Sequence, residues 1–260
     1  MLNSKGVEIL LKQDKVVVFS GIAGVTFLAW LYMFRMAMGM SESGMDMTKP
    51  CVMAWDAWEL VLMFIMWSIM MIAMMLPSAT PMVLIFSTVN RQRSETESPL
   101  IPTGVFVLGY LAAWTAFSAL ATLAQWGLHE AALLSHTMVI SNSFLGGILL
   151  LTSGVFQWTP FRDACMARCR SPLGFLLTDW REGNRGALIM GLKHGAYCVG
   201  CCWMLMTLSF VLGVMNLLWM AILTAFMLLE KVIPWSRWVS RLSGLALAVW
   251  GLWVVAGGIR

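Results

Sequence analysis

Long uncharged apolar runs constrain this 260-residue chain more than any other feature. A bilayer core about 30 Å thick is crossed by a helix of roughly 20 apolar residues. With 60% hydrophobic and only 12% charged residues, the chain falls outside the class of soluble globular proteins. The sequence predicts an all-α, polytopic transmembrane bundle in which residues 1–260 form one domain. About seven helices are expected, at 16–38, 57–76, 101–125, 141–159, 186–214, 216–233 and 240–258.

Prolines, short connections and isolated charges shape the expected helices. The second run continues through Pro77 and Pro81 to about residue 89, so its inner end should be kinked or broken. The fifth and sixth runs are separated only by residues 213–217, which predicts a tight helical hairpin. Because unpaired charges within hydrocarbon are costly, we expect Lys193 and Glu230 to pair between these two helices.

The distribution of basic residues predicts the orientation in the membrane. With the N-terminus in the cytoplasm, thirteen of the seventeen lysines and arginines fall on the cytoplasmic side, as the positive-inside rule requires. Residues 160–185 then form a cytoplasmic loop rich in arginine and cysteine, and residues 39–55 form an outer methionine-rich loop. We expect an integral protein of the bacterial inner membrane.

The fifth apolar run contains the strongest local signal for chemistry. Residues four apart share a helix face, and thiolate and thioether donors favour Cu(I), with Zn(II) next. One ion could join His194 to Cys198, or Cys198 to Cys201 or Cys202, with a neighbouring helix completing its shell. The alternative is that each cysteine is only a small buried apolar residue. The stripe comprises Met190, His194, Cys198, Cys202 and Met206.

A second cysteine pair lies in the segment after the fourth run. If residues 161–172 are helical, the sulfurs of Cys165 and Cys169 share one face and can grip a soft ion together. Neighbouring arginines would favour their thiolate forms. The alternative is a basic loop that faces lipid headgroups and carries incidental cysteines.

The outer side offers a competing location for a metal. Asp56 and Glu59 begin the second run, where carboxylates also suit the helix dipole. Together with His129, Glu130 and His136 they could form a metal site rich in oxygen and nitrogen, or they could be ordinary solvated polar residues. Methionines at 36–47 precede Cys51 and either capture Cu(I) or belong to an undistinguished segment.

Several motifs resemble the DUF2182 family, which is described as predicted metal-binding integral membrane proteins and is sometimes labelled copper chaperones. The resemblance spans about residues 55–250 and implies a shared fold and a metal role for His194, Cys198, Cys201, Cys202, Cys165 and Cys169. It does not supply a biochemical activity. The motifs are Trp67–Met82, Gly109–Trp114, Gln157–Pro172, His194–Trp203, Gly213–Trp219 and Glu230–Lys231.

Copper handling is the leading function: acquisition, membrane passage or delivery to a membrane cuproprotein. In this hypothesis, outer methionines capture Cu(I), the His/Cys stripe holds it, and the Cys165/Cys169 pair passes it on. The first alternative is a copper-dependent membrane oxygenase or a thiol redox enzyme. The second is a non-catalytic subunit of a larger membrane complex. The expected partners are the lipid bilayer and a membrane cuproprotein, and no nucleic acid is expected.

Overall fold

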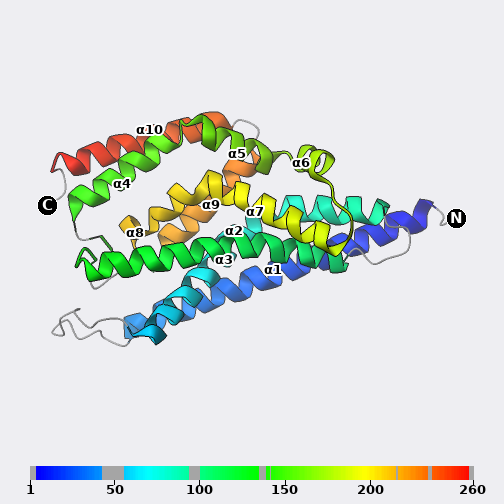
Figure 1. The fold of residues 1–260 in the computed structure, drawn as a ribbon, viewed down its shortest axis with the longest axis horizontal. Helices are drawn as coiled ribbons and strands as arrows, with labels where there is room; N and C mark the ends of the chain where they lie inside the picture. Colours follow the sequence, from blue (N-terminus) through cyan, green and yellow to red (C-terminus); the bar gives the residue numbers. More distant parts are fainter. Residues whose placement is uncertain are drawn as a thin grey trace.

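The computed structural model describes residues 4–42, 56–93, 100–134, 139–140, 142–214, 216–233 and 236–257. Across these ranges the chain is helical and contains no β-strand, which confirms the all-α class. In Figure 1, α1 runs alongside α2, α3 alongside α7, and α4 alongside α10. The helices are α1 (Ser4–Glu42), α2 (Ala57–Arg93), α3 (Leu100–Glu130), α4 (Ser143–Phe156), α5 (Pro160–Arg170), α6 (Pro172–Asp179), α7 (Gly183–Thr207), α8 (Ser209–Leu212), α9 (Leu217–Val232) and α10 (Ser236–Val255).

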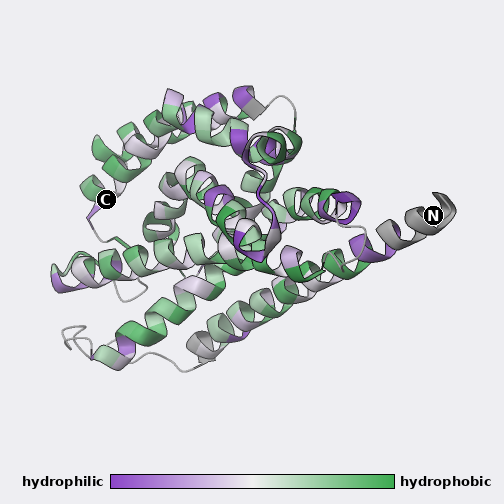
Figure 2. Cartoon of the chain, turned by 45° about the vertical axis from the view of Figure 1, so that its right-hand side comes forward, coloured by the Kyte–Doolittle hydropathy of each residue, from purple (hydrophilic) through white to green (hydrophobic). Residues whose placement is uncertain are grey.

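Five of these helices, or six if α4 and α5 are counted as one bent span, are long and apolar enough to cross a membrane. Figure 2 shows hydrophobic residues along the helices and hydrophilic residues gathered at helix ends and connections. The predicted number of seven is not confirmed: among the described helices, α9 has 16 residues and α4 has 14, fewer than the roughly 20 that cross a bilayer core. The cytoplasmic location of the N-terminus stays a prediction.

Helix α2 continues through both of its prolines, so it is not broken there, and a kink at this position stays a prediction. Pro77 has no N–H and leaves the carbonyl of Ala73 without its helical partner. Trp30 on α1 compensates by donating its indole Nε1–H to Ala73 O at 3.0 Å. Two residues further on, Tyr110 on α3 donates to Met75 O at 3.0 Å. Hydrogen bonds from neighbouring helices thus stabilise the proline-containing turn.

Glycines set the close approach of helix pairs, because small residues let membrane helices pack closely. A Cβ at Gly195 of α7 would lie 2.6 Å from the Ala113 Cβ on α3, and a Cβ at Gly191 would collide with Phe106 O. A Cβ at Gly154 of α4 would lie 2.7 Å from the Ala248 nitrogen on α10. These contacts lock α7 against α3 and α4 against α10.

The segment that follows α4 is folded, whereas the sequence predicts a loop over 160–185. Thr159 takes an extended conformation before Pro160 and caps α5 by accepting from the Arg162 amide. The chain therefore turns by 64° between α4 and α5, and α5 packs along α7.

The connection after α7 also differs from the expected hairpin. Gly213 has a φ of 95°, a left-handed conformation that favours glycine. It lies between α8 and α9, and α9 then packs chiefly against α2 and α10. The prediction of a tight hairpin between the fifth and sixth runs is therefore wrong.

Candidate functional site

The ligand-type stripe predicted on the fifth run lies on the buried side of α7. His194 is 3% exposed, and the other four members are fully buried. The glycines of α7 let this helix pack closely against α3. The stripe is therefore enclosed by protein. The enclosed members besides His194 are Met190, Cys198, Cys202 and Met206.

Helix α5 brings the second cysteine pair to α7. Cys165 and Cys169 are one turn apart and both are buried. Cys165 lies so close to α7 that its Sγ would be 3.0 Å from a Cβ at Gly200. This segment is helical over Pro160–Arg170, as the hypothesis that the two sulfurs share one face requires.

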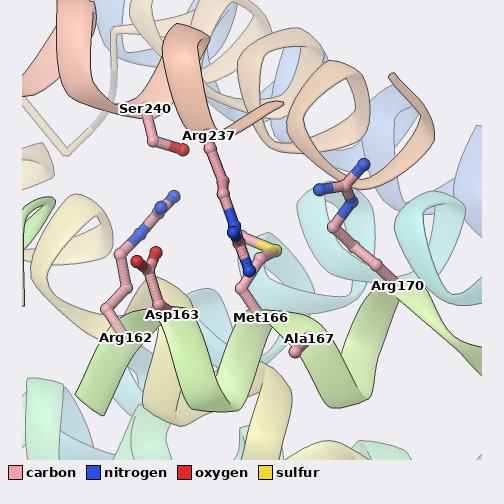
Figure 3. A pocket seen from close by; sticks show the side chains of 7 residues that line it. All are labelled: Arg162, Asp163, Met166, Ala167, Arg170, Arg237 and Ser240. Carbon is pink, nitrogen blue, oxygen red and sulfur yellow. The ribbon is translucent and has the colours of Figure 1, made fainter. Parts of the chain in front are cut away.

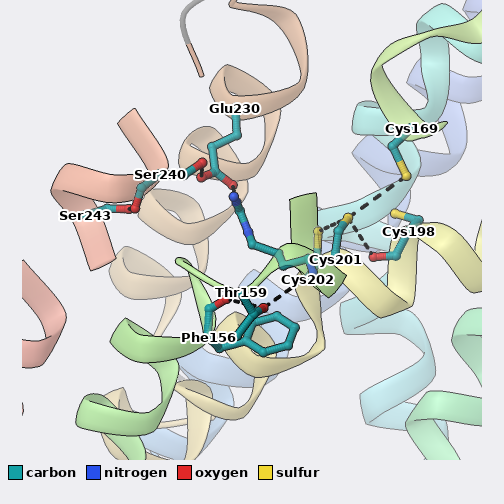
Figure 4. Close-up of polar contacts among 10 residues, drawn as sticks. Phe156, Thr159, Cys169, Cys198, Cys201, Cys202, Glu230, Ser240 and Ser243 are labelled. Carbon is teal, nitrogen blue, oxygen red and sulfur yellow. Dashed lines mark hydrogen bonds and ion pairs between the residues drawn. The ribbon is translucent and has the colours of Figure 1, made fainter. Parts of the chain in front are cut away.

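Four cysteines meet where α5 contacts α7. The Sγ atoms of Cys169 and Cys201 are 4.0 Å apart, and those of Cys201 and Cys202 are 3.2 Å apart. Cys201 Sγ also donates to Cys198 O at 3.2 Å. Figure 4 shows Cys201 between its three neighbours. From the sequence, the stripe and the Cys165/Cys169 pair are expected to be two separate sites. In the structure, cysteines of α5 and α7 form one cluster, which we call the sulfur cluster: Cys169, Cys198, Cys201 and Cys202.

Polar groups from α9 and α3 contact Cys198, and a hydroxyl of α2 contacts one of them. Lys231 of α9 donates to Cys198 Sγ at 3.0 Å and to Ser78 Oγ of α2 at 2.7 Å. Tyr110 Oη of α3 lies 3.2 Å from the same sulfur. Sequence reasoning missed these three partners, although Tyr110 and Lys231 lie in motifs that carry the family resemblance.

His194 lies beside the sulfur cluster in an aromatic pocket. Its ring centroid is 5.8 Å from that of Tyr110, 6.2 Å from Phe106 and 5.6 Å from Phe175. Its Nδ1 is buried and has no hydrogen-bond partner among the described residues. The imidazole is therefore held by packing, with one ring nitrogen free to accept or bind.

The predicted Lys193–Glu230 pair does not form. Glu230 is paired with Arg162 of α5, with Nη2 and Oε2 2.6 Å apart, and it accepts from Ser240 of α10 at 2.6 Å. Lys193 instead pairs with Asp179 of α6 at 2.8 Å. The expectation failed because it placed Arg162 and Asp179 in a loop, whereas α5 and α6 bring both to the bundle.

The outer carboxylates are far from the sulfur cluster. Asp56 and Glu59 are exposed at the start of α2. Met75 of α2 marks the level of the cluster, because Tyr110 contacts both Met75 O and Cys198 Sγ. Glu59 lies sixteen residues before Met75, which corresponds to about 24 Å along the helix. His129 is half-buried and Glu130 exposed at the end of α3. His136 and most of the outer methionine-rich loop lie outside the described residues.

Within the described ranges, no three His, Cys, Asp or Glu side chains are arranged to hold one metal ion as they stand. The closest sets of soft donors are the sulfur pairs Cys201–Cys202 and Cys169–Cys201. Closing a three-ligand site around an ion would require side-chain rotation.

A family model described as "PpoB2: Copper chaperone" matches residues 64–254, which is most of the chain. No curated protein and no solved structure matches. The matched span contains the sulfur cluster and Lys231 but excludes Asp56 and Glu59. It supports copper handling as the broad function, and it does not name DUF2182.

Proposed function

Because the chain belongs to the PpoB2 copper chaperone family, we propose that it binds Cu(I) as cargo at the sulfur cluster and hands it on at the membrane. The observation that carries the proposal is the contact of Cys169 of α5 with Cys201 of α7, whose sulfur also lies beside that of Cys202 on the same helix. Thiolates are the protein ligands that select Cu(I) most strongly, with zinc a weaker candidate.

The sulfur spacing fits a shared ion. Metal–sulfur bonds are roughly 2.3 Å long, so two bonds to one ion span at most about 4.6 Å. Both the 4.0 Å Cys169–Cys201 separation and the 3.2 Å Cys201–Cys202 separation fall within this reach. Cys201 belongs to both pairs, so an ion can pass from Cys202 to Cys169 by ligand substitution without leaving sulfur. The thiols lose their protons as the ion binds.

Lys231 orders the ligands around this centre. Its ammonium lies 3.0 Å from Cys198 Sγ, and like charges repel strongly in a medium of low dielectric constant. We therefore place the ion first on Cys201 with Cys169 or Cys202. Cys198 then joins as a further ligand when the bound ion displaces Lys231 from its sulfur, and His194 and Cys165 lie beside the cluster as additional donors.

The direction of transfer follows from the predicted orientation. The excess of arginine and lysine in residues 160–185 supports a cytoplasmic location for α5 and α6, so Cys169 is the exit-side ligand. The outer methionines at 36–47 are the proposed capture segment. A membrane cuproprotein is the proposed acceptor, and the bacterial inner membrane is the proposed location.

Metal analysis of the purified full-length protein tests the site. After loading with Cu(I), Cys201→Ser and Cys198→Ser should each retain less copper than Cys51→Ser, the matched control outside the family match. Thermal unfolding followed by tryptophan fluorescence should show that all three variants are folded. Asp56→Asn and Glu59→Gln should keep their copper. Retention in both α7 variants with loss in the carboxylate variants would move the site to the outer end of α2 and favour the oxygenase hypothesis.

A further inference from the structure

A small pocket lies between α5 and α10, away from the sulfur cluster. Its volume is about 70 Å³. In Figure 3, Arg237 reaches from α10 toward Met166 on α5, between Arg162 and Arg170. Three guanidinium groups therefore surround one cavity. The complete lining is Arg162, Asp163, Met166, Ala167, Arg170, Arg237 and Ser240.

Two arginines of this pocket have unused donors. Arg162 bonds Glu230 through Nη2 and Arg170 bonds Ile233 O through Nη2, yet the Nε atoms of both are buried without a partner among the described residues. A buried donor left without an acceptor destabilises the folded protein. An acceptor bound in the pocket would remove that penalty.

The charges around the pocket leave a single positive excess. Arg162, Arg170 and Arg237 contribute three positive charges, while Asp163 in the lining and Glu230 behind it contribute two negative charges. Arg237 is exposed and forms no salt bridge within the described part of the chain. The pocket is therefore matched to a group with one negative charge.

The surroundings place the pocket at a membrane interface. Trp238, next to Arg237, is 65% exposed, and Trp158 and Phe161 near the start of α5 are also largely exposed. Tryptophan is typical of the headgroup region of a bilayer, and basic pockets between membrane helices bind anionic headgroups. Guanidinium forks match the geometry of phosphate oxygens.

We propose that the Arg162/Arg170/Arg237 pocket binds a phosphate-type anion, presented by the headgroup of an anionic lipid or as free phosphate. The bound group would accept from Arg237 and from the unused donors of α5. Binding would join α10 to α5, the helix that carries Cys165 and Cys169.

Ligand titration of the full-length protein in detergent tests the proposal. The probes are short-chain phosphatidylglycerol, phosphatidylcholine of the same chain length, and inorganic phosphate, with the unfolding midpoint measured by tryptophan fluorescence. Phosphatidylglycerol should raise the midpoint more than phosphatidylcholine, because only the former has net negative charge. Arg237→Gln should weaken this binding roughly tenfold, the effect of losing one charged hydrogen bond.

Arg241→Gln is the matched control, since Arg241 is one turn further along α10, exposed, and absent from the lining. It should bind as the unaltered protein does. The affinity of Arg237→Lys should lie between those of Arg237→Gln and Arg241→Gln. Lysine keeps the positive charge but lacks the planar guanidinium that can bind two phosphate oxygens. Arginine-dependent binding of inorganic phosphate alone supports the anion site and identifies a soluble source. No binding of either anion, or equal binding by Arg237→Gln and the unaltered protein, overturns the proposal.

Discussion

Replacing Glu230 by glutamine should destabilise the fold far more than a typical charge removal. Glu230 is fully buried and Arg162 is 1% exposed, and the carboxylate also accepts from Ser240. The variant leaves the Arg162 guanidinium buried without its counter-charge, which typically costs about 3–5 kcal/mol. The matched control is Lys193→Gln. Its ion pair with Asp179 has side chains 41% and 19% exposed, and such pairs contribute about 0–1 kcal/mol.

The free energy of unfolding in mixed micelles, with tryptophan fluorescence as the probe, measures both variants. The double variant Arg162→Gln/Glu230→Gln should be less destabilised than the sum of its single variants, because removing both partners leaves no uncompensated charge. Strictly additive losses, or a Glu230→Gln cost no larger than that of Lys193→Gln, would refute the buried pair.

Three further changes have defined outcomes. Gly191→Ala should destabilise by about 1–3 kcal/mol through overpacking against α3, whereas Gly104→Ala, with open space around its Cβ position, should not; a thermal melt that fails to separate them contradicts the α3–α7 contact. The Lys193 hydrogen bond lowers the pKa of Asp179 below its ordinary 3.8, so the stability this pair contributes is present above that pH and lost as pH falls through the lowered pKa. Asp179→Asn should flatten this acid dependence of unfolding. A cysteine placed at Ser94 should resist a membrane-impermeant thiol reagent in intact cells that lack other reactive thiols, and its labelling would reverse the predicted orientation.

The sequence predicted the helical class because long apolar runs are a local property of the chain. Its count of seven spans is not confirmed, because apolar length does not show where a run divides. The run 141–159 ends at the Thr159–Pro160 step, where α5 begins in a new direction. Helix α9 is too short to count as a span by itself.

The sequence predicted candidate residues for the site, whose role as ligands stays a prediction, and it did not predict how they assemble. Helical spacing found the α7 stripe, and the motif resemblance included Cys165 and Cys169. The contact of Cys169 with Cys201 depends on how α5 packs against α7 at Gly200. The spacing of residues along one helix does not determine how two helices pack. The role of Lys231 was missed because a lysine near the end of a membrane helix fits the positive-inside rule as well as it fits a buried hydrogen bond.

X-ray absorption at the copper K edge of the Cu(I)-loaded full-length protein tests the central claim most directly. Sulfur coordination at the α5–α7 contact predicts scattering from sulfur at roughly 2.3 Å, and that sulfur shell should shrink in Cys201→Ser but not in Cys51→Ser. A shell of nitrogen and oxygen that Cys201→Ser leaves unchanged would contradict copper binding at the sulfur cluster.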